Sequence, residues 1–230
     1  MLLHYFGGSA RSWEPLTAVL GGHCLAPDLR GFGDAPPGGP MRVADYADDA
    51  MPLLRDGCIL VGHSMGGKVA LTVAARRPPG LRGLVLVAPS PPGPEPMTDD
   101  SRTKLRAAWN DPEAAQELAR TISRHGDGPA FDRIVADHLR ASQRGWLAWL
   151  DEGSKENLCA LAEQVAVPVL VVAGAEDEAL GPDVQERETM PSLPSATLHI
   201  IAGSRHLIPL DAPEQLGAAI TGWTEALADR

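Results

Sequence analysis

Positively charged residues are in the minority in this 230-residue sequence. Only 20 lysines and arginines stand against 30 aspartates and glutamates, which gives a formal net charge of -10 and a pI near 5.1. A chain with this balance offers no electrostatic footprint for nucleic acid or for an anionic membrane surface. The overall apolar fraction of 44% and charged fraction of 22% are ordinary for a globular domain. Composition therefore excludes more functions than it identifies.

Cysteines and long apolar runs are also scarce. The three cysteines, Cys24, Cys58 and Cys159, lie far apart and show no metal-ligand spacing, so we expect reduced thiols in a cytoplasmic protein. No stretch approaches the roughly 20 apolar residues that a membrane-spanning helix needs. The first residues, MLLHYFGG, contain no basic segment and no long apolar core, so we expect no signal peptide.

Apolar runs alternate with helical patterns along most of the chain. Strands are predicted at residues 2–3, 23–26, 59–61, 84–87, 168–173 and 197–201, and helices at 12–20, 43–55, 65–76 and 213–228. Alternation of this kind predicts an α/β fold with a mostly parallel sheet and helices on both faces. The rhythm breaks at residues 90–163, where a proline-rich start is followed by helical composition. We therefore expect a core of residues 1–89 and 164–230, with residues 90–163 inserted after a core strand as a helical cap.

A serine between glycines is the first chemical signal. The stretch GHSMGGKVAL begins at Gly62, directly after the apolar run 59–61 and directly before a predicted helix. This G-x-S-x-G pattern at a strand-to-helix corner is typical of a nucleophile elbow, which holds Ser64 out from the sheet at a helix N-terminus. The alternatives are a glycine-serine loop without chemistry and a phosphate-binding turn, although Val69 follows Lys68 where a P-loop requires serine or threonine.

A base and an acid for that serine follow in order. A serine hydroxyl needs a base, normally imidazole, and a carboxylate to orient that base. His206 follows the last predicted strand and Asp177 follows the strand before it. Glu176 and Glu178 are rivals for the acid. The remaining histidines either lie in or beside predicted strands or belong to the inserted segment, which makes them weaker candidates for the base.

These pieces resemble the α/β-hydrolase-fold serine hydrolases, of the small cap-bearing carboxylesterase type. The stretches that carry the resemblance are HYFGGSARSW from residue 4, DLRGFGDA from 28, GHSMGGKVAL from 62, PVLVVAGAEDE from 168 and GSRHLIPLDAPEQL from 203. The resemblance implies catalytic Ser64, Asp177 and His206. It also implies an oxyanion hole made by the backbone amides of Phe6 and Met65, and no metal or organic cofactor.

The sequence departs from this family in two places. Tyr5 stands where relatives usually carry glycine in an HG pair, so this side chain either crowds the entrance or reshapes the loop that carries Phe6. His4 is expected to brace that loop, and His63 to be a packing residue. Relatives also have two further antiparallel strands before His4, where only three residues stand here. Either the sheet is reduced to about six strands, or the chain starts further upstream.

The resemblance leaves the reaction open. A carboxylesterase acting on small or medium acyl esters is the first hypothesis. A C–C bond hydrolase, a lactonase, a thioesterase, a cofactor-free perhydrolase and a non-catalytic ligand receptor are the alternatives, because one fold and triad serve many reactions. The expected partner is a small-molecule ester, with no nucleic acid and no membrane, and the chain is expected to be a monomer or a homodimer. The tryptophans of residues 90–163 either line the acyl pocket or belong to the core.

Overall fold

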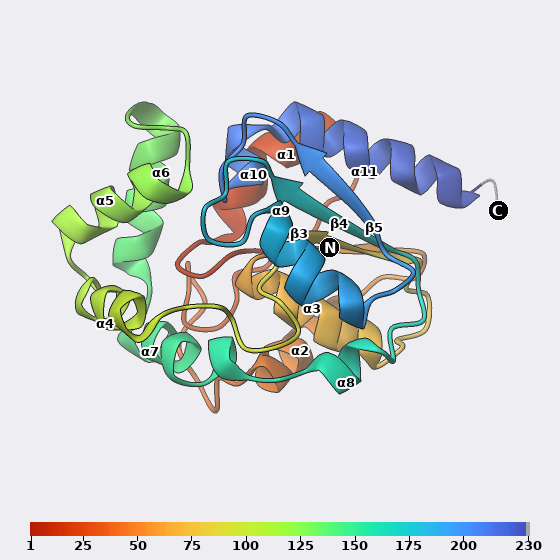
Figure 1. The fold of residues 1–230 in the computed structure, drawn as a ribbon, viewed down its shortest axis with the longest axis horizontal. Coiled ribbons are helices and arrows are strands. Elements are labelled where there is room, and N and C mark those ends of the chain that lie inside the picture. Colours follow the sequence, from red (N-terminus) through yellow and green to blue (C-terminus); the bar gives the residue numbers. More distant parts are fainter. Residues whose placement is uncertain (229–230) are drawn as a thin grey trace.

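Five strands form one sheet in a computed structural model, which describes residues 1–228 (Figure 1). The strands are β1 (Leu2–Leu3), β2 (Ile59–His63), β3 (Gly83–Val87), β4 (Val169–Gly174) and β5 (Thr197–Ile201). They pair in the order β1-β2-β3-β4-β5, and every pair is parallel. The predicted α/β class is confirmed, with five strands where about six were expected.

The predicted strand at residues 23–26 is wrong. Only one ladder-type hydrogen bond ties this segment to the sheet, from the Leu2 amide to the Leu25 carbonyl (2.8 Å). The neighbouring strand β1 is only two residues long, and Pro27 has no amide hydrogen with which to continue the pairing. The segment therefore runs beside the sheet edge as irregular chain.

Helices surround the sheet. Their bounds are η1 Ala10–Trp13, α1 Glu14–Leu20, α2 Val43–Ala50, η2 Met51–Leu53, α3 Met65–Ala75, α4 Asp99–Ala107, α5 Pro112–Ile122, α6 Gly128–Arg140, α7 Gln143–Asp151, η3 Gly153–Lys155, α8 Cys159–Ala162, α9 Pro182–Val184, η4 Gln185–Thr189, η5 Met190–Ser192, α10 Ile208–Asp211 and α11 Pro213–Ala228. The helix predicted over 43–55 ends as an α-helix at Ala50 and continues as a 3-10 turn, because Pro52 cannot donate the next backbone hydrogen bond.

Both faces of the sheet are buried, which explains why its strands show no polar alternation. In β3, Leu84 and Leu86 pack on the side of α2 and α3, while Val85 and Val87 pack on the side of α1 and α11. All four side chains are fully buried, and each contributes about 2 kcal/mol of transfer free energy. The sheet is thus the rigid platform on which the loops at its carboxyl edge are mounted.

Residues between β3 and β4 form helices and no strand. Helices α4 to α7 lie together beside the sheet, on the left in Figure 1, and α8 packs against α3. Among residues 1–228, no helix combines the length and the apolar character needed to cross a membrane.

Candidate active site

Ser64 stands at a strained corner between β2 and α3. Its backbone has φ 53° and ψ -117°, a conformation that costs a non-glycine residue about 1–3 kcal/mol. The corner is held on the sheet side by the Ser64 amide, which donates to the Val87 carbonyl (3.0 Å), and on the helix side by the Gly67 amide, which donates to the Ser64 carbonyl (2.8 Å). The corner therefore has the geometry that the elbow pattern predicts.

The glycines around this corner have no room for a side chain. A Cβ atom on Gly62 would lie 2.2 Å from the Gly66 carbonyl oxygen, and one on Gly66 would lie 2.3 Å from the Leu3 carbonyl oxygen. Both distances are far below van der Waals contact. On Gly67 the added atom would lie 2.8 Å from Pro89. These contacts explain why glycine occupies each position, as the sequence indicated.

Asp177 and His206 are hydrogen-bonded to each other. Asp177 follows β4, His206 follows β5, and His206 Nδ1–H donates to Asp177 Oδ2 over 2.7 Å. The other carboxylate oxygen accepts the amides of Ala179 (2.9 Å) and Leu180 (3.0 Å). Because Nδ1 carries the hydrogen, Nε2 of the neutral ring is left as the basic nitrogen.

The hydrogen bond from His206 selects among the three predicted acids. It reaches Asp177, while the side chains of Glu176 and Glu178 lie exposed on the same loop. Asp177 and His206 are each only 8% exposed. Of the three carboxylates after β4, only this one is buried against the imidazole.

Burial and charge act in opposite directions on this pair. Burial alone would raise the pKa of Asp177, but its attraction and hydrogen bond to His206 outweigh burial and lower that pKa below the ordinary value. Burial alone would lower the pKa of His206, but the same partner outweighs it and raises that pKa. Asp177 is thereby kept ionised beside the imidazole.

All three predicted residues, Ser64, Asp177 and His206, line one cavity of about 380 Å³. Ser64 Oγ makes no hydrogen bond to His206 or to any other described residue between 1 and 228. The remaining lining is mostly apolar: Tyr5, Phe6, Pro96, Met97, Leu105, Leu118, Ile122, Trp149, Ala179 and Leu180.

The two backbone amides predicted to form the oxyanion hole have no acceptor among residues 1–228. The amide of Met65 begins helix α3, and the amide of Phe6 lies in the loop after β1. Neither donates a hydrogen bond to any residue in the described range 1–228. His4 braces the loop as expected: its Nε2 accepts from the Leu29 amide (3.0 Å), and its Nδ1–H donates to the Tyr5 carbonyl (2.8 Å).

Tyr5 is buried in the cavity wall. Its ring is 2% exposed and lies against two histidine rings, with centroids 5.3 Å from His63 and 6.1 Å from His138. It also fills the space beside Gly8, where a Cβ atom would lie 2.4 Å from the tyrosine ring. His63 donates from Nε2–H to the His206 carbonyl (2.9 Å), so it supports the backbone of the histidine loop.

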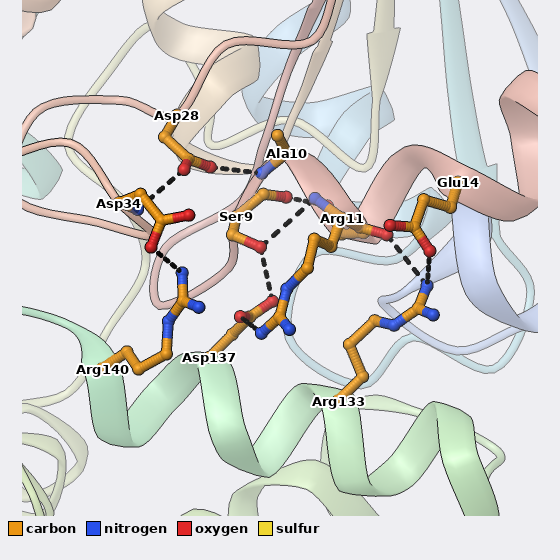
Figure 2. Close-up of polar contacts among 10 residues, drawn as sticks. Ser9, Ala10, Arg11, Glu14, Asp28, Asp34, Arg133, Asp137 and Arg140 are labelled. Carbon is orange, nitrogen blue, oxygen red and sulfur yellow. Dashed lines mark hydrogen bonds and ion pairs between the residues drawn. The ribbon is translucent and has the colours of Figure 1, made fainter.

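Helix α6 is fastened to the segment that follows Phe6 (Figure 2). Asp137 on this helix accepts the Ser9 hydroxyl at 2.7 Å and forms an ion pair with Arg11. One turn earlier, Arg133 pairs with Glu14 at 2.8 Å. Three polar contacts on one helix face therefore tie residues 90–163 to the segment next to the predicted oxyanion loop.

Two titratable cavity residues were not predicted from the sequence: Glu95 and His138. His138 was set aside because it lies in the inserted segment, although its i, i+3, i+7 spacing with Phe131 and Ile134 places all three on the buried face of α6. It is 3% exposed, and neither ring nitrogen has a hydrogen-bond partner in the described chain. Burial lowers the pKa of His138 to about 4, so the ring is neutral at pH 7.

Trp149 has both of the roles expected for the tryptophans of residues 90–163, because it belongs to the buried core and to the cavity wall. Trp146 is a core residue, 1% exposed, whose Nε1–H donates to the Leu105 carbonyl (2.8 Å). Trp109 is partly buried and donates to the Ala141 carbonyl (2.9 Å).

Among residues 1–228, no three His, Cys, Asp or Glu side chains converge in an arrangement that could hold a metal ion.

Comparisons with known proteins agree with this architecture. Residues 1–219 match the family described as "Alpha/beta hydrolase family". A pimeloyl-[acyl-carrier protein] methyl ester esterase from Aromatoleum aromaticum is 29% identical over 242 residues, covering 96% of this chain and 95% of that protein. A 2-succinyl-6-hydroxy-2,4-cyclohexadiene-1-carboxylate synthase from an Enterobacter species is 26% identical over 242 residues, covering 96% and 89%.

Two further comparisons concern a longer relative and a solved structure. The biotin biosynthesis bifunctional protein BioHC from Cellvibrio japonicus is 28% identical over 245 residues, and the match covers 99% of this chain but 48% of that longer protein. The crystal structure of a bromoperoxidase from Bacillus anthracis superposes with a TM-score of 0.86 at 19% identity, covering 97% of this chain and 90% of the other. At that identity the similarity shows the fold alone.

Proposed function

The chain belongs to the alpha/beta hydrolase family, and from that premise we propose that it cleaves carboxylic esters of small to medium acyl chains. Ser64 is the nucleophile, His206 the general base and Asp177 the residue that orients the base. The observation that carries the proposal is the 2.7 Å hydrogen bond from His206 to Asp177 beside a cavity that Ser64 also lines. Relatives that include esterases support the same reaction class.

Acylation begins at the strained corner. Ser64 Oγ attacks the ester carbonyl carbon while His206 Nε2 takes the hydroxyl proton, so one C–O bond forms and the carbonyl electron pair moves to oxygen. The carboxylate of Asp177 stabilises the imidazolium that results. His206 then returns this proton to the departing alcohol, which leaves an acyl-serine.

Deacylation repeats these steps with water. His206 removes a proton from water, the hydroxide attacks the acyl carbon, and the proton passes back to Ser64 as the acid leaves. In both halves the amides of Phe6 and Met65, which have no other acceptor in the described chain, hold the oxyanion. Met65 starts an 11-residue helix, whose dipole adds to this stabilisation. Removing one such donor typically costs about 10²–10³ in kcat.

Residues 90–163 act as a cap over the core of residues 1–89 and 164–230. Helices α4 to α7 contribute Ser101, Leu105, Leu118, His138 and Trp149 to the cavity wall. A cap of this kind excludes water and shapes the acyl pocket. The cavity volume of about 380 Å³ suits a ligand at the smaller end of the usual range.

Hydrolysis of p-nitrophenyl esters of increasing chain length tests the proposal. We expect multiple turnover, a chain-length optimum set by the cavity, and at least a 10³-fold loss of kcat in Ser64→Ala and His206→Ala. An organophosphonate should label one residue, Ser64. The matched control is Ser195→Ala, which makes the same chemical change at an exposed position and should keep wild-type kcat.

Two results would contradict the proposal. Ester turnover that survives in Ser64→Ala would rule out the serine mechanism. Absence of turnover with every ester, thioester and lactone offered, together with tight retention of a ligand, would instead identify a receptor built on this fold.

A further inference from the structure

The charges around the cavity all have one sign. Its lining contains three carboxylates, Glu95, Asp177 and Glu178. Among the described residues that line it, there is no lysine and no arginine. Asp177 is paired with His206, whereas the other two carboxylates have no cation at the cavity surface.

Of these two carboxylates, Glu95 is partly buried, whereas Glu178 is exposed. The former lies between Pro94 and Pro96 at the start of the inserted segment, and its amide is anchored to the Ser154 carbonyl (2.7 Å). Its Oε2 is closed off from solvent and has no hydrogen-bond partner within the described range. It is close enough to His206 for each to shift the pKa of the other.

The two nearest cations, Lys68 and Arg102, do not reach the cavity. Lys68 Nζ donates to the carbonyls of Gly93 (2.9 Å) and Glu156 (2.7 Å). Arg102 Nη1 donates to the Leu150 carbonyl and the Ser154 hydroxyl, both at 2.6 Å. Neither of the two lines the cavity, whereas Glu95 does, and both cations are bound to main-chain or hydroxyl oxygens.

The neighbouring imidazole offers no compensating charge either. His138 is buried in the same wall and is neutral at pH 7, because burial lowers its pKa to about 4. Burial raises the pKa of Glu95 above its ordinary value, although Ser90, His206, Lys68 and Arg102 each act in the opposite direction. In a largely apolar cavity, a charge of like sign on the ligand is weakly screened.

We infer that this cavity selects esters whose acyl chain is uncharged and rejects those whose chain ends in a carboxylate, and that Glu95 is the residue that enforces the selection. The inference rests on the esterase function proposed above and names its substrate class. It also separates this chain from relatives whose names contain a carboxylate-bearing compound.

Three p-nitrophenyl esters of equal chain length test the inference at pH 8: the hexanoate, the 6-aminohexanoate and the monoadipate. An apolar cavity disfavours both charged chains. The ratio of kcat/KM between the ammonium ester and the carboxylate ester cancels this shared cost and reports the sign of the electrostatic potential in the cavity. We expect hexanoate to be the best substrate and the ammonium ester to exceed the carboxylate ester at least tenfold. Glu95→Gln should reduce that ratio about tenfold.

The matched control is Glu178→Gln, which removes the same charge from an exposed position on the same cavity. Because solvent screens that charge, the ratio should change less than about twofold. Glu95→Asp keeps the charge and should keep most of the ratio, which separates an electrostatic role from a packing role.

The outcomes are distinguishable. If wild-type protein hydrolyses the two charged esters within twofold of each other, or if Glu95→Gln leaves the ratio unchanged while hexanoate is turned over, the inference is wrong and the esterase function stands. If none of the three esters is hydrolysed, the proposed function itself fails. The wild-type ratio tests the substrate class even where a Glu95 variant does not fold.

Discussion

The ion pair between Arg11 and Asp137 should be much more sensitive to the loss of one partner than to the loss of the other. The Asp137 side chain is 1% exposed and the Arg11 side chain is 40% exposed. In Arg11→Met the buried carboxylate keeps only the Ser9 hydroxyl as a donor, and stranding a buried charge costs about 3–5 kcal/mol. In Asp137→Asn the guanidinium turns into solvent, and the expected cost is about 1–2 kcal/mol.

Chemical denaturation in urea at constant pH measures both costs. For a chain of this length, 1 kcal/mol corresponds to roughly 2–4 °C in Tm, so thermal melts should rank the two variants in the same order. The double variant should be no less stable than Arg11→Met alone, because the second substitution removes the stranded charge. Glu14→Gln breaks the neighbouring pair with Arg133 that Figure 2 shows. Because the side chains of Arg133 and Glu14 are 30% and 56% exposed, this change should cost less than about 1 kcal/mol.

The reasoning would be refuted if Asp137→Asn were as destabilising as Arg11→Met, or more so. Equal losses in the free energy of unfolding would mean that the Asp137 carboxylate becomes hydrated when Arg11 is replaced. Helix α6 would then not exclude water from this ion pair. A loss of kcat without a loss of stability in Asp137→Asn would instead assign the pair a role in positioning the loop that carries Phe6.

Three further predictions concern pH and backbone space. Burial lowers the pKa of His206, but Asp177 outweighs it and raises that pKa above 6.5, so the acidic limb of kcat/KM should have its midpoint above pH 6.5 and move to lower pH in Asp177→Asn. Burial lowers the pKa of Lys68 from 10.5 to about 8. As the pH rises, the folded state therefore releases the Lys68 proton at a lower pH than the unfolded state does. The free energy of unfolding, measured by urea denaturation, should rise by about 2 kcal/mol between pH 7.5 and pH 10. Lys68→Met should lack this rise, and a rise of equal size in that variant would assign it to other groups. Gly66→Ala should lose about 2 kcal/mol or more together with activity, because the new Cβ would lie 2.3 Å from a carbonyl oxygen of β1. In contrast, Gly222→Ala in open space on α11 should gain about 0.5–1 kcal/mol in the same denaturation assay.

The elements that could be predicted are those whose signal is local. The buried runs of β2 and β4 and the helix that starts at Met65 are where the apolar pattern placed them. The segment 23–26 failed because a short apolar run does not make a strand unless a neighbour offers it a long enough edge. The strand beside it, β1, is two residues long.

Candidate site residues show the same division. Ser64 was identified from its glycine neighbours, and His206 and Asp177 from their positions after successive strands. No local sequence pattern identified Glu95 or His138 as a site residue. Each lines the cavity through the tertiary packing of residues 90–163, and that packing depends on contacts with residues far away in the sequence.

The sequence by itself determined the α/β class, the corner at Ser64 and the order in which a serine, a carboxylate and a histidine follow the strands. Periodicity and glycine spacing act over a few residues, so they can be read without knowing the fold. Tertiary structure alone decided that His206 bonds to Asp177 and not to its two acidic neighbours. It also decided that Tyr5 lies buried in the cavity wall and that a cavity without lysine or arginine surrounds Ser64 in the described chain. These outcomes depend on which side chains long-range packing buries, and burial is a property of the whole fold.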